Sequence, residues 1–246
     1  MGRVAEVEQH GEIPADLTIR TGKRQGAKWQ RHLFSRQESI RTTWKLRLAL
    51  LMLGILLVAV TRGLWTRWIG HSLVCREVIG YSDVILVENF TPNYLLFERA
   101  AALHTAGLAP HILVPTPAAH GSVRPNAVSR GIVKVMGRVA GMPEPEVLPI
   151  QITEPISLHA AYQIRDFLTT AHHQSVLVVT SGFRSQRASL IYQAVLAPAG
   201  IRVYCVPVFG QKTPANWSET WHGIQEVAEQ FLKLQYYRFY VLLTRT

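Results

Sequence analysis

A fivefold alternation of short apolar runs with longer amphipathic segments dominates the sequence from residue 84 to residue 232. The apolar runs, each of strand length, are Val84–Asn89, His111–Pro115, Val147–Ile152, Ser175–Thr180 and Ile201–Val208. The segments of helix length that follow them are Tyr94–Ala106, Ala127–Val139, Ile156–Leu168, Ser185–Leu196 and Trp217–Leu232. Five strand–helix units in series predict an α/β fold, a Rossmann-like doubly wound parallel sheet of about five strands with helices on both faces.

The turns of this pattern carry the residues that end helices. Gly107, Gly141 and Gly200 each follow a helical segment, at the position where a left-handed C-terminal cap favours glycine. The last residues, YYRFYVLL from Tyr236 to Leu243, fit either a closing strand or an interfacial patch.

A long apolar stretch precedes the alternation. Residues 46–61 carry one charge, Arg47, and the uncharged part of this stretch begins at Leu48. That part is 14 residues long, shorter than the roughly 20 residues of a spanning helix, so a buried helix is the alternative. Flanking tryptophans, which favour a membrane interface, are Trp44, Trp65 and Trp68. We therefore expect one N-terminal membrane helix over residues 44–69.

The formal net charge of +10 is concentrated before this stretch. Between Arg20 and Arg47 there are nine basic residues and one acid, Glu38. Anionic lipid explains a basic segment beside an apolar one more simply than nucleic acid does. The bias predicts a basic, largely disordered cytoplasmic tail over residues 1–43 and a single-pass cytoplasmic-membrane protein with its N-terminus inside. Residues 70–246 then form an extracytoplasmic Rossmann-like α/β domain.

Two cysteines, Cys75 and Cys205, are present. They could pair in an oxidising compartment, but the apolar run around Cys205 favours a buried thiol. The sequence shows no C-x-x-C and no metal-binding pattern, so we expect no metal site.

Ligands of such sheets bind at the carboxyl ends of the strands, where the strand order reverses. Orders that place the first strand beside the fourth or the third direct attention to the loops after Asn89, Ile152 and Thr180. The candidates for ligand binding are Asn89, Asn93, Arg99, Thr180, Ser181, Arg184 and Arg187. The candidates for acid–base catalysis are Glu88, Glu154 and His159.

Each candidate also has a structural interpretation. Asn93 and Glu154 could cap the helices that follow them, and His159 could be an ordinary helical histidine. The two arginines after Thr180 could bind an anion at a helix N-terminus, or pair internally with Glu88 or Glu154. No glycine occurs between Ser82 and Ala106, which argues against a conventional dinucleotide loop.

Three stretches resemble the YdcF-like, SanA and ElyC family of bacterial envelope proteins: SDVILV from Ser82, the segment from Arg99 through GLAPHILVP, and VLVVTSGFRSQRA from Val176. The likeness spans roughly residues 82–232 and implies a Rossmann-like domain, an N-terminal membrane segment and a link to envelope polysaccharide or peptidoglycan physiology. Binding of S-adenosylmethionine is suggested for some members. The chain departs from the family at its glycine-rich and acid–base motifs: Glu88-Asn89-Phe90 replaces glycines after the first strand, and Arg184 stands where a histidine is expected.

These observations favour a membrane-anchored envelope protein whose α/β domain binds an anionic small molecule or a glycan intermediate. A non-catalytic scaffold of an envelope assembly is one alternative. A hydrolase or transferase acting on phosphate or glycosyl bonds is another, which would depend on Glu88 and Glu154 as the acid–base pair.

Overall fold

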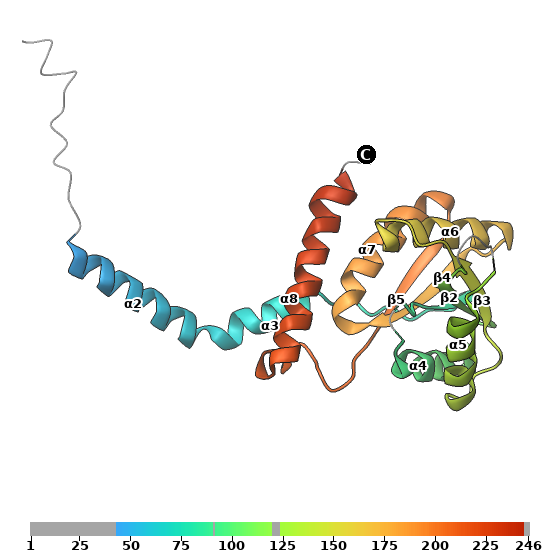
Figure 1. The fold of residues 1–246 in the computed structure, drawn as a ribbon, viewed down its shortest axis with the longest axis horizontal. Helices are drawn as coiled ribbons and strands as arrows, with labels where there is room; N and C mark the ends of the chain where they lie inside the picture. Colours follow the sequence, from blue (N-terminus) through green and yellow to red (C-terminus); the bar gives the residue numbers. More distant parts are fainter. Residues whose placement is uncertain (1–42, 91, 120–123, 244–246) are drawn as a thin grey trace, which may run out of the picture. The chain divides into compact units, whose positions relative to one another are not determined.

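The computed structural model describes residues 43–90, 92–119 and 124–243 (Figure 1). The chain divides into two units, residues 1–53 and 54–246, and the division falls inside α2 (Trp44–Val60). The predicted tail over residues 1–43 lies outside the described residues, apart from its last residue. The second unit begins with the end of α2 and with α3 (Arg62–Ser72), and then alternates strands and helices.

The strands are β1 (Val84–Val87), β2 (His111–Pro117), β3 (Glu146–Ile150), β4 (Ser175–Ser181) and β5 (Arg202–Val208). The α-helices between and after them are α4 (Tyr94–Thr105), α5 (Ala127–Val139), α6 (Ile156–Thr170), α7 (Ser185–Leu196) and α8 (Trp221–Tyr236). Short helices of other types are η1 (Gly182–Arg184), η2 (Ala197–Ala199), η3 (Trp217–Glu219) and the π-helix η4 (Tyr237–Val241).

The five strands form one parallel sheet in the order β3-β2-β1-β4-β5. The predicted α/β class and parallel sheet are thus confirmed. Of the two orders considered, the one that places the first strand beside the fourth is correct. Asp83 links these strands at their start, because its carboxylate accepts hydrogen bonds from the backbone N–H groups of Gln174 and Ser175 at 2.7 and 2.8 Å.

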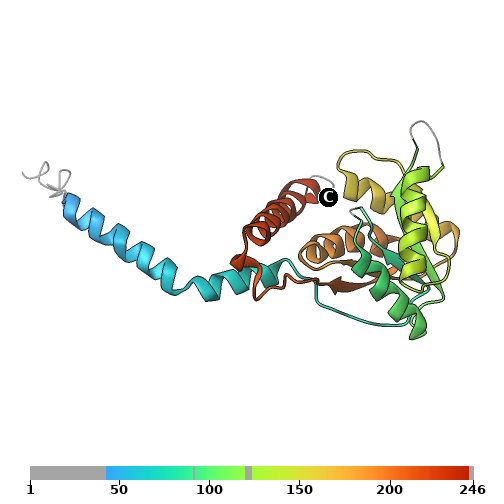
Figure 2. The same ribbon diagram turned by 60° about the horizontal axis from the view of Figure 1, so that its bottom comes forward.

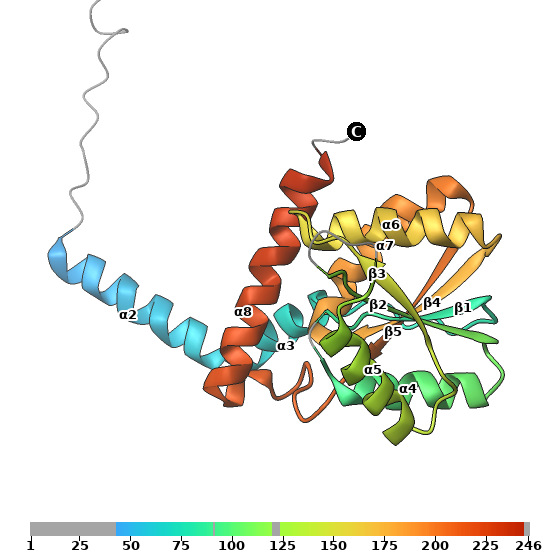
Figure 3. The same cartoon turned by 45° about the vertical axis from the view of Figure 1, so that its right-hand side comes forward.

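Two buried clusters cover the two faces of the sheet. Alternate β1 residues enter different clusters, since Val84 and Leu86 pack with α6 and α7 whereas Ile85 and Val87 pack with α4 and α5. This alternation follows from the period of two along a strand. Figure 3 shows the resulting layers, with α6 and α7 on one side of the sheet and α4 and α5 on the other.

Several predicted boundaries match the structure. The predicted helices over residues 127–139 and 185–196 have the bounds of α5 and α7, and the three glycines expected after helices have positive φ angles of 68–77°. Of the two interpretations of the C-terminal segment, the closing strand is excluded, because α8 continues into η4 and the segment is helical up to Val241. Aromatic residues there occupy a helix surface instead of alternating across a strand.

The single helix predicted over residues 44–69 is two helices, which break at Thr61. Within the described residues no single helix has the length and apolarity to cross a membrane, whereas α2 and α3 taken together as a bent pair do meet those criteria. The reason for the break is visible in α3, which interleaves Arg62 and Arg67 with apolar residues and buries Thr66 and Gly70. The indole Nε1 of Trp217 donates to the carbonyl oxygen of Thr66 at 3.0 Å, so α3 packs on the α/β unit.

Cys75 and Cys205 form a disulfide, so the prediction of a buried free thiol is wrong. Both cysteines are buried, and the bond joins the segment after α3 to β5 across a sequence separation of 130. The same segment reaches α7: the backbone N–H of Cys75 donates to Ser185 Oγ at 2.9 Å, and Leu73 accepts from the Gln186 N–H at 3.0 Å.

Candidate functional site

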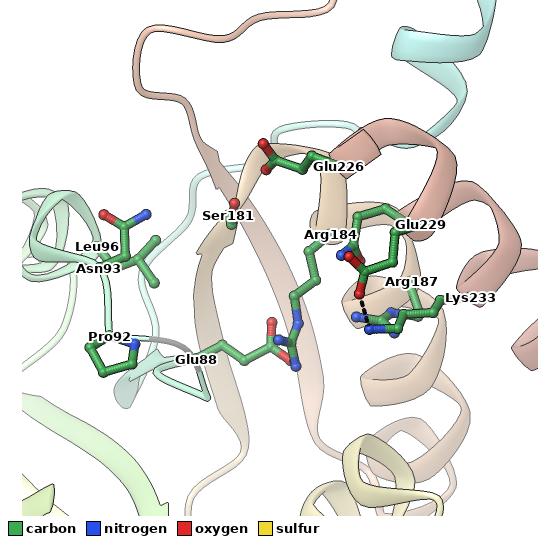
Figure 4. A pocket seen from close by; sticks show the side chains of 11 residues that line it. Glu88, Pro92, Asn93, Leu96, Ser181, Arg184, Arg187, Glu226, Glu229 and Lys233 are labelled. Carbon is green, nitrogen blue, oxygen red and sulfur yellow. Dashed lines mark hydrogen bonds and ion pairs between the residues drawn. The ribbon is translucent and has the colours of Figure 1, made fainter. Parts of the chain in front are cut away.

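A cavity of about 360 Å³ lies at the carboxyl ends of the adjacent strands β1 and β4. From β1 the sheet continues toward β3, and from β4 it continues the other way to β5, so the strand order reverses here. This is the switch point at which open α/β sheets bind ligands. Three segments line the cavity: the loop after β1, the β4–α7 connection with the first turn of α7, and one face of α8 (Figure 4). The lining residues are Glu88, Pro92, Asn93, Leu96, Ser181, Arg184, Arg187, Glu226, Glu229, Gln230 and Lys233.

Glu88 and Arg184 form an internal ion pair at the base of this cavity. Arg184 Nη2 lies 3.2 Å from Glu88 Oε1, and the hydroxyl of Thr180 donates to the other carboxylate oxygen. The Glu88 side chain is almost fully buried, and the Arg184 guanidinium stacks over the Phe90 ring at 5.0 Å. The internal-pair interpretation therefore holds for Arg184, and Glu88 is its partner.

Arg187 differs from Arg184 in lacking such a partner. It is 7% exposed, and no hydrogen bond or ion pair joins its guanidinium to any residue that the structure describes. Its Cζ lies 5.6 Å from the centroid of the Tyr237 ring. Burial lowers the pKa of Arg187 and the positive charge of Arg184 lowers it further, whereas Glu88, Tyr237 and Glu229 act in the opposite direction.

The carboxylates of α8 do not neutralise Arg187. Glu229 pairs with Lys233 one turn along the helix, and Glu226 pairs with Lys212 at 3.0 Å. With Glu88 held by Arg184, each of the three lining carboxylates already has another cation as its salt-bridge partner. Among the described residues that line the cavity, Arg187 is thus the cation that has no carboxylate as an ion-pair partner.

A second hollow of about 280 Å³ shares Asn93, Ser181 and Glu226 with this cavity. It extends toward the end of β5 and is walled by Phe183 and Phe209, whose rings meet edge to face with centroids 5.8 Å apart. Together the two hollows give the site a charged end at Arg187 and an aromatic end at Phe209.

The β4–α7 connection does not provide the helix N-terminus expected from the sequence. The 3-10 helix η1 intervenes between β4 and α7, and the Gln186 N–H in the first turn of α7 is already bound to the carbonyl of Leu73. Any anion bound here would consequently be held by the Arg187 side chain more than by free backbone donors.

Other predicted residues are distributed as follows. Asn93 caps α4, since its side chain accepts from the Leu95 N–H at 3.1 Å, and it also lines both hollows. Asn89 and Thr180 are buried and do not line the cavity, and Asn89 Oδ1 has no partner among the described groups. Arg99 pairs with Glu77 at 3.2 Å on the surface of α4, and it is absent from the cavity lining.

The candidates after β3 lie away from this cavity. Glu154 is exposed, and His159 is half-buried in α6; neither lines the cavity. The separation follows from the strand order, because β3 is the outer strand and two others stand between it and β4. The prediction that Glu154 caps α6 is wrong, since Pro155 occupies the N-cap position and no side-chain cap is made there.

The sequence reasoning did not single out the four α8 residues that line the cavity. Glu226, the adjacent pair Glu229 and Gln230, and Lys233 follow one another at a spacing of three or four residues, which places these side chains on one helix face. This polar face is the sequence signal that could have identified α8 as a wall of the cavity. Among the residues that the structure describes, no group of three or more histidine, cysteine, aspartate or glutamate side chains could hold a metal ion.

The fold and the site define a Rossmann-like α/β unit with a polar switch-point cavity. Searches against family models, curated proteins and solved structures returned no match for this chain.

Proposed function

We propose that this protein is a membrane-anchored envelope protein whose α/β unit binds a small anionic molecule, with a phosphate or carboxylate group at Arg187. The observation that carries the proposal is the unpaired state of that buried guanidinium. A buried cation is costly unless an anion accompanies it, and the neighbouring carboxylates are already paired. A ligand anion would supply the missing partner through bidentate, charge-assisted hydrogen bonds.

The size of the cavity supports a small-molecule ligand. Ligand pockets typically enclose about 300–1,000 Å³, and the cavity at Arg187 encloses about 360 Å³ before the adjoining hollow is added. The aromatic end at Phe209 suits the C–H face of a sugar ring or a planar group. A phosphorylated or acidic glycan intermediate would match both ends, in keeping with the resemblance to envelope proteins.

Binding is better supported than catalysis. The acid–base pair suggested by the sequence does not assemble, because Glu88 lines the cavity and Glu154 does not. The Glu88 carboxylate accepts from Thr180 and pairs with Arg184, so both of its oxygens already have partners within the protein and it is poorly placed to exchange protons with a ligand.

The disulfide supports the proposed location. Disulfides persist in oxidising compartments and are rare in the cytosol, so Cys75–Cys205 suits an α/β unit outside the cytoplasmic membrane. The basic residues before α2 suit an N-terminus that stays inside. All of α2 is exposed, and it carries no acidic residue, as suits an anchor surrounded by lipid.

The test compares the full chain with its Arg187→Met and Arg99→Met variants in detergent, titrated with inorganic phosphate and with a sugar phosphate. Arg187→Met should weaken binding at least about tenfold, because one charge-assisted hydrogen bond contributes about 1.5–3 kcal/mol. Arg99→Met is the matched control, since it removes a surface arginine whose ion pair contributes at most about 1 kcal/mol.

Thermal unfolding of the same variants separates ligand binding from a purely structural role. Removing an unpaired buried cation should leave the melting temperature unchanged or raise it, because its desolvation penalty disappears. A lower melting temperature in Arg187→Met, with equal phosphate effects on all three proteins, would support the scaffold alternative instead. Phosphate stabilises many proteins non-specifically, so the difference between variants is the relevant quantity.

A further inference from the structure

Another hollow of the unit, separate from the candidate site and of about 440 Å³, lies between α3 and α8 and has almost purely hydrocarbon walls. Trp65 and Ile69 of α3 face Ile224, Val227 and Phe231 of α8 across it, with Arg62 at one border. Figures 1 and 2 show the two helices side by side. We refer to this hollow as the α3–α8 groove.

The polar groups that line the α3–α8 groove are already bonded to the protein. The indole N–H of Trp217 donates to the Thr66 carbonyl, and the Thr66 hydroxyl donates to the carbonyl of Arg62 at 2.7 Å. The guanidinium of Arg62 reaches the carbonyl of Ser218 at 3.3 Å. The groove thus offers hydrocarbon surface and few free hydrogen-bonding groups, which suits an apolar occupant.

The surface of α8 beside the groove is also apolar. Trp221, Ile224, Ala228, Leu232 and Tyr236 recur every three or four residues and are all exposed, with Trp221 at 71% and Leu232 at 69%. The charged residues of α8 lie instead on the side that lines the anion cavity. An exposed helix face without charges is unusual for a surface that meets only water.

The adjoining surface of α3 has the composition of a membrane interface. Leu64 and Trp68 are among its most exposed residues. Arg62 precedes Leu64 in the sequence, and Arg67 directly precedes Trp68. Tryptophan and tyrosine favour the level of lipid headgroups, and arginine there can contact lipid phosphate. A helix pair that met a second copy of the chain would more typically present leucine or isoleucine flanked by paired charges.

The chain also connects this surface directly to α2. Thr61 is the one residue between the end of α2 at Val60 and the start of α3 at Arg62. If α2 is embedded in a bilayer, as in the proposed function on which this step rests, α3 must begin at the bilayer surface. We propose that the exposed face of α3 and α8 rests on that lipid surface and that the α3–α8 groove receives a lipid acyl chain.

The experiment places the full chain in vesicles of phosphatidylcholine and phosphatidylglycerol that contain a phospholipid with a photoreactive acyl chain. Adducts formed on illumination are mapped by mass spectrometry. Lipid adducts should appear on α3 and α8, with Trp65, Ile224 and Phe231 among the modified residues. The matched control is α5, which lies well away from α3 and α8 in Figure 1 and whose Val128 and Val135 are 71% and 61% exposed.

The labelling pattern separates this proposal from the proposed anchor. Labelling of α2 with none on α3 and α8 would refute the lipid-facing surface and leave the anchor intact. Labelling of α3 and α8 without α2 would refute the anchor and support the surface. Equal labelling of α5 and α8, or protein–protein crosslinks at α8 in place of lipid adducts, would overturn the proposal in favour of non-specific contact or of a second copy of the chain.

A pair of variants tests the same surface without relying on the groove. Leu232→Glu places a charge on the exposed face, where folding should tolerate it, and should reduce adducts on α8 by about tenfold because a carboxylate is costly near hydrocarbon. Val135→Glu makes the same change on α5 and should leave adducts on α8 unchanged. Equal adduct yields on α8 in the two variants would count against the proposal.

Discussion

Opening the Cys75–Cys205 disulfide should destabilise the α/β unit by an amount set by the length of chain that the bond closes. With a sequence separation of 130, the chain-entropy relation gives about 5 kcal/mol at 25 °C. For a unit of this size, each kcal/mol corresponds to about 2–4 °C in melting temperature, so the expected fall is about 10–20 °C. The stabilisation arises mainly in the unfolded chain, whose freedom the bond restricts.

The assay is differential scanning fluorimetry of the full chain in detergent, in three forms: native, reduced, and Cys75→Ala/Cys205→Ala. Reduction keeps both sulfur atoms in place and so isolates the cross-link, whereas the alanine variant adds the cost of a small cavity in a buried site. The reduced protein should melt well below the native one, and the alanine variant at the same temperature as the reduced protein or lower. A fall of less than about 2 °C on reduction would refute the loop-closure reasoning. Free thiols in protein purified under non-reducing conditions would refute the disulfide itself.

Three further substitutions test the site and its supports. Glu88→Gln should lower the stability by about 3 kcal/mol in chemical denaturation, because it leaves the partly buried guanidinium of Arg184 without its carboxylate. Gly182→Ala should cost about 1–3 kcal/mol, since the new Cβ would lie 2.1 Å from the Phe209 ring, whereas Gly131→Ala on exposed α5 meets nothing within 4 Å and should not destabilise. Burial, together with Glu88, raises the pKa of Tyr192 well above its ordinary value of 10.0. The unfolded chain therefore loses this proton first, the free energy of unfolding falls as the pH rises above about 10, and Tyr192→Phe should flatten that loss in urea titrations.

The layered fold was predictable because its signal is local. Buried strands such as β4 read as apolar runs, and helices such as α7 show apolar residues at helical spacing, so the sequence locates both without knowledge of their neighbours. The break at Thr61 was less visible. In the sequence, α2 and α3 form one continuous apolar stretch. What distinguishes α3 is the burial of Thr66 and Gly70, which pack on the α/β unit.

The sequence predicted where the candidate site lies, but not which of its charged residues form an ion pair. The sequence brings Glu88 and the two arginines after β4 to the same edge of the sheet. Whether Arg184 or Arg187 receives the carboxylate depends on separations of a few ångströms that no spacing encodes. The disulfide joins residues 130 apart in the sequence, and the contribution of α8 depends on how this helix packs against η1 and α7, which local patterns do not encode.

The disulfide also makes a covalent ring of the chain from residue 75 to residue 205. All five strands start within this ring, as do Glu88, Arg184 and Arg187, whereas α2 lies before it and α8 after it. A protease that cut any single peptide bond between the two cysteines would therefore leave both fragments tethered to α2. In any oxidising compartment where the disulfide persists, one nick within this ring would release no part of the domain.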